Sequence, residues 1–128
     1  MQNFKKINTL VGFGVLLFAT VVYAMTMESS GSFWDCGEFV SGCWKLQVVH
    51  APGAPFFLML GRLFTLFAFG DTTKVAMMVN FMSGLSTAAS IMFCYWSVVM
   101  LAKKMFFTDK NNPTSGEAIA VMGAGLIA

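Results

Sequence analysis

One stretch of the chain gathers the side chains that could do chemistry, "FWDCGEFVSGCWKLQVVHAPGAPFF" at 33–57. It contains two of the six acidic residues, Asp35 and Glu38, and the only histidine, His50. Carboxylates and imidazole are the groups most used for proton transfer in proteins. Arg62 follows a few residues later, inside an apolar run. What these groups do depends on the elements that position them.

The composition favours a membrane protein. Of the 128 residues, 57% are hydrophobic and 11% are charged, whereas soluble domains carry about 25% charged residues. The net charge of +2 is too small to predict nucleic-acid binding. Cys36 and Cys43 would lie about 10 Å apart on a helix, beyond the roughly 7 Å reach of a disulfide. Together with Cys94 they are predicted to be packing residues.

Two segments are predicted to span the bilayer. Residues 7–27 carry no charge and are long enough to cross about 30 Å of hydrocarbon. The alternative for this segment is a cleaved signal peptide, because residues 22–24 have the small-residue spacing of a cleavage site. Residues 75–102 form the second predicted span, closed by Lys103 and Lys104. Small residues at i, i+4 inside this span predict close packing against other helices.

The lysines also predict the path of the chain between these spans. Lys5 and Lys6 predict a cytoplasmic N-terminus. If Lys103 and Lys104 are also cytoplasmic, the chain must cross the membrane an even number of times between the two lysine pairs. Residues 55–69 cover only about 23 Å as a helix. They are therefore predicted to form a juxtamembrane helix within an outer loop at 28–74. A full crossing by 55–69 is the alternative, and it would place the second lysine pair outside.

A third span is predicted to begin at residue 118, after a polar turn in which Pro113 acts as a helix breaker. Only about 11 apolar residues of it are present, which reach some 17 Å. The chain is therefore expected to be the N-terminal piece of a longer polytopic protein.

The outer loop is predicted to contain a short amphipathic helix at 35–48 that lies along the membrane surface. Asp35 and Glu38 are one turn apart on one of its faces. Trp34 and Trp44 are predicted to be interfacial anchors. The sequence "HAPGAP" then breaks the helix and restarts the chain as the helix at 55–69.

Here the sequence resembles a known family. The stretch "FWDCGEFVSGCWKLQVVHAPGAPFFLMLGRLF" is similar to the signature of polytopic Bacteroidota membrane proteins of formerly unknown function. That signature has an acid-x-glycine-glutamate box and, about a dozen residues later, a His-Pro-Pro-Gly-x-Pro turn. It also resembles the animal O-mannosyltransferase that modifies IPT domains and, more distantly, the GT-C glycosyltransferases. Ala51 replaces the first proline of the turn. The resemblance implies an all-α, polytopic GT-C-like fold.

The resemblance implies a membrane glycosyltransferase. It would move a sugar, mannose by analogy, from a polyprenyl-phosphate donor to Ser/Thr of exported proteins at the periplasmic face of the inner membrane. Asp35 is the implied general base, and Glu38 would orient the acceptor or share the proton. Arg62, Lys45 and His50 are candidates to bind the donor phosphate, or, for His50, the donor sugar. No Cys/His cluster predicts a metal site, although the two carboxylates are compatible with a divalent cation.

Each candidate also has a structural explanation. The stretch from Ser32 to Asp35 has the pattern of a capping box, and the other possibility is that Asp35 itself caps the following helix, with Glu38 returning the bond. Lys45 has the features of a snorkelling surface lysine. For His50, just before the turn, the alternative is a hydrogen bond within the loop. Arg62 is different, because a guanidinium within a short apolar helix is costly and indicates function. For the chain as a whole, the alternative is a non-catalytic transporter segment or assembly scaffold. A transporter is expected to carry its charges inside the spans, near the midplane of the membrane. This chain has charged residues in the outer loop instead, which favours the enzyme.

Overall fold

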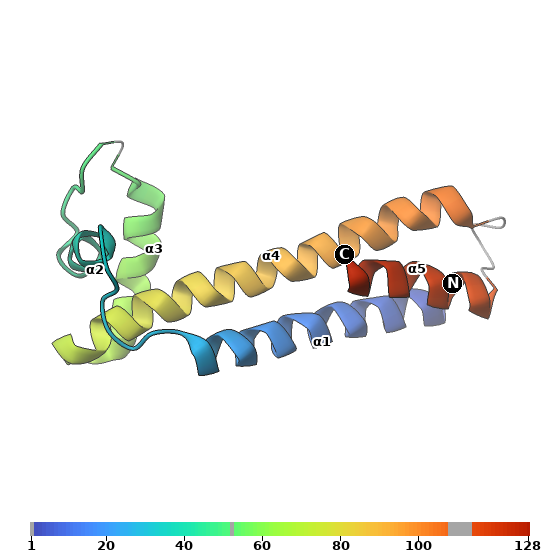
Figure 1. Cartoon of the computed structure of the whole chain (residues 1–128), viewed down its shortest axis with the longest axis horizontal. Helices are drawn as coiled ribbons and strands as arrows, with labels where there is room; N and C mark the ends of the chain where they lie inside the picture. Colours follow the sequence, from blue (N-terminus) through green and yellow to red (C-terminus); the bar gives the residue numbers. More distant parts are fainter. Residues whose placement is uncertain (1, 52, 108–113) are drawn as a thin grey trace. The chain divides into compact units, whose positions relative to one another are not determined.

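The computed structural model describes residues 2–51, 53–107 and 114–128, and every regular element in these ranges is helical. The predicted turn at Pro113 lies outside the described residues. The all-helical class predicted from the sequence is confirmed. Figure 1 labels the main helices along the chain. In chain order the elements are α1 (Gln2–Thr26), α2 (Cys36–Lys45), α3 (Pro55–Thr65), η1 (Leu66–Ala68), η2 (Thr72–Lys74), α4 (Val75–Phe106) and α5 (Ser115–Ile127).

Two helical segments are long and apolar enough to cross a membrane, Asn3–Thr26 and Thr72–Phe106. They coincide with the predicted spans at 7–27 and 75–102, and each is longer because its flanking lysines are also helical. The helix α5 begins at Ser115, three residues before the predicted start at 118.

The early start of α5 has a local cause, because Thr114 and Glu117 form a capping box that satisfies the first amides of the helix. The Thr114 hydroxyl accepts from the Glu117 amide at 3.3 Å, and the Thr114 amide donates to the Glu117 carboxylate at 2.8 Å.

The chain divides into two compact units, residues 22–86 and residues 1–21 with 87–128. In the unit formed by residues 1–21 and 87–128, apolar side chains of α1, α4 and α5 pack around Tyr95, which is 2% exposed. The Tyr95 hydroxyl donates to the Asn8 side chain at 2.9 Å, which satisfies a polar group within an apolar core. A Cβ at Gly12 would overlap the Trp96 ring, so this glycine permits the close approach of α1 to α4.

The unit at 22–86 contains all the predicted site residues. Its core is formed by Cys43 of α2, Leu58 of α3, Val79 and Met82 of α4, and Val49 of the loop between α2 and α3. The helices α2 and α3 pack directly on each other, as Figure 1 shows.

The close packing of α2 on α3 requires two glycines. A Cβ at Gly61 would overlap the sulfur of Cys43, whose side chain is completely buried. A Cβ at Gly42 would lie 2.8 Å from a methyl group of Val49. Side chains at either position would push apart elements that are packed at close to crystal density.

Left-handed residues define the ends of these short helices. The predicted helix to residue 48 is wrong at its end, because α2 stops at Lys45 and Leu46 adopts φ 51° and ψ 48°. The backbone N–H of the Leu46 cap donates to the carbonyl oxygen of Gly42, which satisfies one of the last carbonyls of α2. Ala54 is also left-handed, with φ 40°, and Pro55 then occupies the first turn of α3, where its missing N–H costs nothing.

Candidate functional site

Asp35 occupies the N-cap position of α2, but its side chain makes no capping hydrogen bond. The preceding Trp34 has a left-handed φ of 66° and a side chain that is 94% exposed. Glu38 lies in the first turn, and its carboxylate does not return to the cap. The predicted capping box of Asp35 and Glu38 is therefore wrong.

Glu38 binds His50 through both of its oxygens. Oε1 accepts the backbone N–H of His50 at 2.7 Å, and Oε2 lies 2.8 Å from its Nδ1. The two residues are twelve apart in the chain and meet because Leu46 reverses the backbone and the side chain of Val49 packs into the core. Glu38 thus attaches the loop to the first turn of α2.

Asp35 completes the cluster from the other side of the imidazole. Its Oδ2 lies 3.9 Å from His50 Nε2, which is close enough for an ion pair but too long for a hydrogen bond. The side chains of His50 and Asp35 are 52% and 50% exposed, so the gap between them is open to solvent. The ring of Phe39 contacts the imidazole edge-on at 5.8 Å and limits its rotation.

The hydrogen bonds between Glu38 and His50 shift the titration of both groups. The side-chain bond, followed by the backbone bond, lowers the pKa of Glu38 from its ordinary value of 4.5. The same side-chain bond, then the charge of Glu38, raises the pKa of His50 above 6.5. The charge of Asp35 adds to the second effect. The imidazolium form of His50 is thus favoured between two carboxylates.

The cluster brings together three side chains that are possible ligands of a divalent ion. One ligand atom from each of Asp35, Glu38 and His50 lies within 4.8 Å of the other two. However, both oxygens of Glu38 and the Nδ1 atom of His50 already bind each other. A metal ion needs these atoms deprotonated and directed at one point. A metal ion at this site would bind His50 through Nε2 and so requires the neutral imidazole, whereas the bond from Nδ1 to Glu38 favours the imidazolium.

Arg62 lies away from this cluster and holds the C-terminal end of α2. Its Nη1 donates to the carbonyl oxygen of Trp44 at 2.6 Å, and the guanidinium carbon lies 5.1 Å from the centroid of the Trp44 ring. Thr65, which is 0% exposed, donates its hydroxyl proton to the Arg62 carbonyl at 2.8 Å. The guanidinium thus attaches α3 to the end of α2. Lys45 is exposed in the last turn of α2, about two turns from Glu38.

Asn80 is a positioning residue that sequence analysis missed. Its amide group donates to the carbonyl oxygens of Glu28 at 2.9 Å and Ser30 at 3.2 Å. These bonds fix the start of the loop before α2 against α4. The available signal was a single amide side chain among the apolar residues at the start of the predicted second span.

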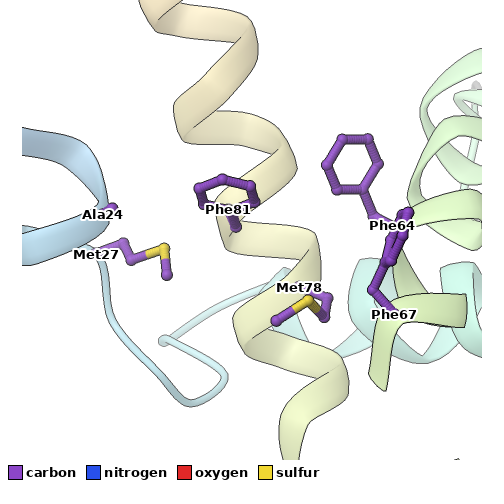
Figure 2. Close-up of a pocket in the computed structure, with 6 residues that line it drawn as sticks. All are labelled: Ala24, Met27, Phe64, Phe67, Met78 and Phe81. Carbon is purple, nitrogen blue, oxygen red and sulfur yellow. The ribbon is translucent and has the colours of Figure 1, made fainter. Parts of the chain in front are cut away.

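The same unit contains an apolar pocket of about 500 Å³. Figure 2 shows the side chains that surround it, which come from the end of α1, the α3 and η1 segment, and the start of α4. They are Ala24, Met27, Phe64, Phe67, Met78 and Phe81. None of these side chains carries a hydrogen-bonding group, so the pocket suits an apolar chain.

The structure is that of a helical membrane protein with a polar site. Two of its helices are long and apolar enough to cross a membrane, and the segment between them contains the cluster of ionisable groups. The family described as the protein O-mannosyl-transferase TMEM260 N-terminal domain matches residues 35–128. The chain belongs to this family. The matched range includes all five predicted site residues.

Two curated relatives support the assignment. Protein O-mannosyl-transferase tmem260 of Dictyostelium discoideum is 35% identical over 88 residues, which cover 67% of this chain and 11% of the relative. Protein O-mannosyl-transferase TMEM260 of Mus musculus is 36% identical over 91 residues, 69% of this chain and 12% of the relative. The chain thus spans about a tenth of the length of these relatives. No solved structure matches the chain significantly.

Proposed function

We propose that this chain is part of a protein O-mannosyltransferase in which Asp35 is the general base. The curated relatives carry this activity in their names. The observation that carries the residue assignment is the asymmetry of the acid pair. Both oxygens of Glu38 are occupied by His50, whereas Asp35 is half-exposed and its side chain caps no helix. Asp35 is the carboxylate that can accept a proton from a substrate.

The chemistry requires such a group. The hydroxyl of serine or threonine is a poor nucleophile, and a carboxylate that takes its proton accelerates the attack by roughly 10²–10⁴-fold. The O–H proton moves to Asp35 while the oxygen bonds to the anomeric carbon of mannose. The bond from that carbon to the lipid phosphate breaks, and the phosphate leaves with the electron pair. The transition state has oxocarbenium character, as in glycoside hydrolysis.

The donor is proposed to be a polyprenyl-phosphate sugar. The apolar pocket lined by the end of α1, the α3 and η1 segment and the start of α4 supports a long hydrocarbon chain as ligand, because its side chains offer no polar contacts. Lys45 is the proposed phosphate-binding cation of the loop, since it is exposed and bears no ion pair among the described residues. Arg62 is the weaker candidate, because it already binds the Trp44 carbonyl.

We propose a GT-C-like, polytopic arrangement in the inner membrane. In this arrangement the N-terminus is cytoplasmic and the segment at 28–74, including α2 and α3, lies in the periplasm. The two candidate spans and the lysine pairs that flank them support this proposal. Exported proteins and the lipid-linked donor then meet the acid pair on the same side of the membrane.

The test is transfer by the full-length protein. The purified protein is incubated with polyprenyl-phosphate mannose and an exported acceptor protein, and glycan addition is followed by mass spectrometry. Asp35→Asn is expected to reduce kcat by at least about 10²-fold while the protein remains folded. Glu28→Gln, which changes an exposed acid of the same segment, is the matched control and is expected to retain transfer. Normal turnover by a folded Asp35→Asn protein would refute the assignment of the base and favour a non-catalytic role for this loop.

A further inference from the structure

We propose that protonated His50 supplies the positive charge between Asp35 and Glu38. This charge positions Asp35 for proton transfer and takes the place of a divalent metal ion. This inference rests on the proposed function, since it concerns the same site. It assigns His50 to the acceptor side of the reaction, whereas the sequence left two alternatives for this residue, contact with the donor and a hydrogen bond within the loop.

The first support is that the ring is held in one orientation. The backbone N–H and Nδ1 of His50 both bind the carboxylate of Glu38, at 2.7 and 2.8 Å. Phe39 contacts the ring edge-on. With Nδ1 committed to Glu38, only Nε2 is free to act on a third group. Glu38 therefore has the orienting role that a carboxylate plays toward histidine in many active sites.

The second support is the direction of Nε2. It lies 3.9 Å from Oδ2 of Asp35, and both groups are half-exposed at this gap. A protonated Nε2 attracts the carboxylate of Asp35 across this gap and so orients it. The groups that face the ring are Glu38 and Asp35 from α2 together with the apolar ring of Phe39, so the imidazolium is flanked by two opposite charges.

The third support is the short separation. Groups that act on opposite faces of a sugar lie about 6.5–9.5 Å apart when one activates a nucleophile and the other assists the leaving group. Nucleophile and acid in retaining enzymes are about 5–5.5 Å apart. The 3.9 Å between Nε2 and Oδ2 is shorter than either spacing. At this shorter separation His50 and Asp35 can both contact the same acceptor hydroxyl.

A divalent ion would have to compete with this arrangement. It would bind Nε2 of a neutral His50, whereas the bond from Nδ1 to Glu38 favours the protonated ring, which has no lone pair for a metal ion. An imidazolium supplies a positive charge in the same place without breaking that bond. The proposal therefore predicts metal-independent transfer.

The experiment uses the full-length protein and separates charge from loop attachment. His50→Asn retains an N–H group near the position of Nδ1, so it can still bind Glu38, but it has no charge and no group at Nε2. His50→Gln places a neutral amide near Nε2. Both variants are expected to lower kcat about 10- to 100-fold, the range found when a group that orients a reactive partner is removed. The control is Val48→Thr, a nearly isosteric change at a loop position that is 92% exposed.

Chemical rescue and chelation provide the second readout. Added imidazole is expected to restore transfer by His50→Ala in proportion to its protonated fraction, because the site is half open. Wild-type transfer is expected to be unaffected by excess EDTA. The inference is overturned if His50→Asn is fully active, if rescue follows neutral imidazole, or if EDTA abolishes transfer and Mn²⁺ restores it. A wild-type protein that transfers no mannose refutes the proposed function itself, and the inference with it.

Discussion

Arg62 is expected to hold α2 and α3 together, and Arg62→Met tests this. The variant removes a charge-assisted hydrogen bond to the Trp44 carbonyl at 2.6 Å, worth about 1.5–3 kcal/mol. It also removes the contact of the guanidinium with the Trp44 ring at 5.1 Å, worth about 0.5–1 kcal/mol. The total loss is about 2–4 kcal/mol of packing free energy between α2 and α3.

Cys43 offers a local assay for this loss. Its side chain is 0% exposed in the interface of α2 and α3, and burial raises the pKa of its thiol, so both effects slow its reaction with a maleimide. In a full-length protein that retains only this cysteine, labelling requires the interface to open. A loss of about 2 kcal/mol or more corresponds to labelling at least about 30-fold faster, at 1.36 kcal/mol per tenfold.

Two comparisons sharpen the result. Arg62→Lys retains the charge but not the planar fork, so its effect is expected to lie between wild type and Arg62→Met. Leu63→Met changes an exposed neighbour on α3 and is expected to leave the labelling rate unchanged. If Arg62→Met alters the rate by less than about threefold, the guanidinium does not hold the interface.

Three further predictions use the same unit. Gly61→Ala places a methyl group against the sulfur of Cys43 and is expected to cost about 1–3 kcal/mol, measured as faster labelling of Cys43; Gly37→Ala, which meets no atom within 4 Å, is the control, and equal rates in both would contradict the packing argument. Ala54→Gly removes a left-handed strain of about 1–2 kcal/mol, partly offset by the greater freedom of glycine in the unfolded chain, so chemical denaturation is expected to show a gain of about 1 kcal/mol or less; a loss would show that the methyl group contributes packing. The bond between Glu38 and His50 contributes its full stability to the loop between pH 4.5 and pH 6.5. Above 4.5 the lowered pKa of Glu38 keeps its carboxylate charged, and below 6.5 the raised pKa of His50 keeps its imidazole protonated. Stability is lost as pH falls through the folded pKa of Glu38 or rises through that of His50, so hydrogen exchange at the His50 amide, corrected for its intrinsic rate, is expected to be slowest between these values; protection independent of pH would refute this.

The long helices were predictable because their signals are local. Residues 7–27 and 75–102 are uncharged apolar runs of span length, and both are helical. The start of α3 at Pro55 follows from the residue itself, since proline fits the first turn of a helix and disrupts later ones. The end of α2 was not predictable from the sequence, because nothing in "KLQVV" indicates that Leu46 becomes left-handed.

The candidate site was only partly predictable for the same reason. The residue types and the helical spacing of Asp35 and Glu38 are visible in the sequence. The contact of Glu38 with His50 depends on the turn at Leu46 and on Val49 entering the core, which are tertiary features. The cost of a charge in an apolar helix correctly marked Arg62 as unusual, but it could not identify the Trp44 carbonyl as its partner.

The tertiary contacts also change the meaning of the acid pair. In the sequence, Asp35 and Glu38 are two similar carboxylates one turn apart, and sharing a proton is a natural interpretation. In the structure they are different, because Glu38 uses both oxygens to hold the loop and Asp35 faces an accessible gap. Two carboxylates in different environments can carry different roles, one structural and one chemical. The variants Glu38→Gln and Asp35→Asn are therefore not equivalent: the first is expected to release the loop and the second to leave it in place.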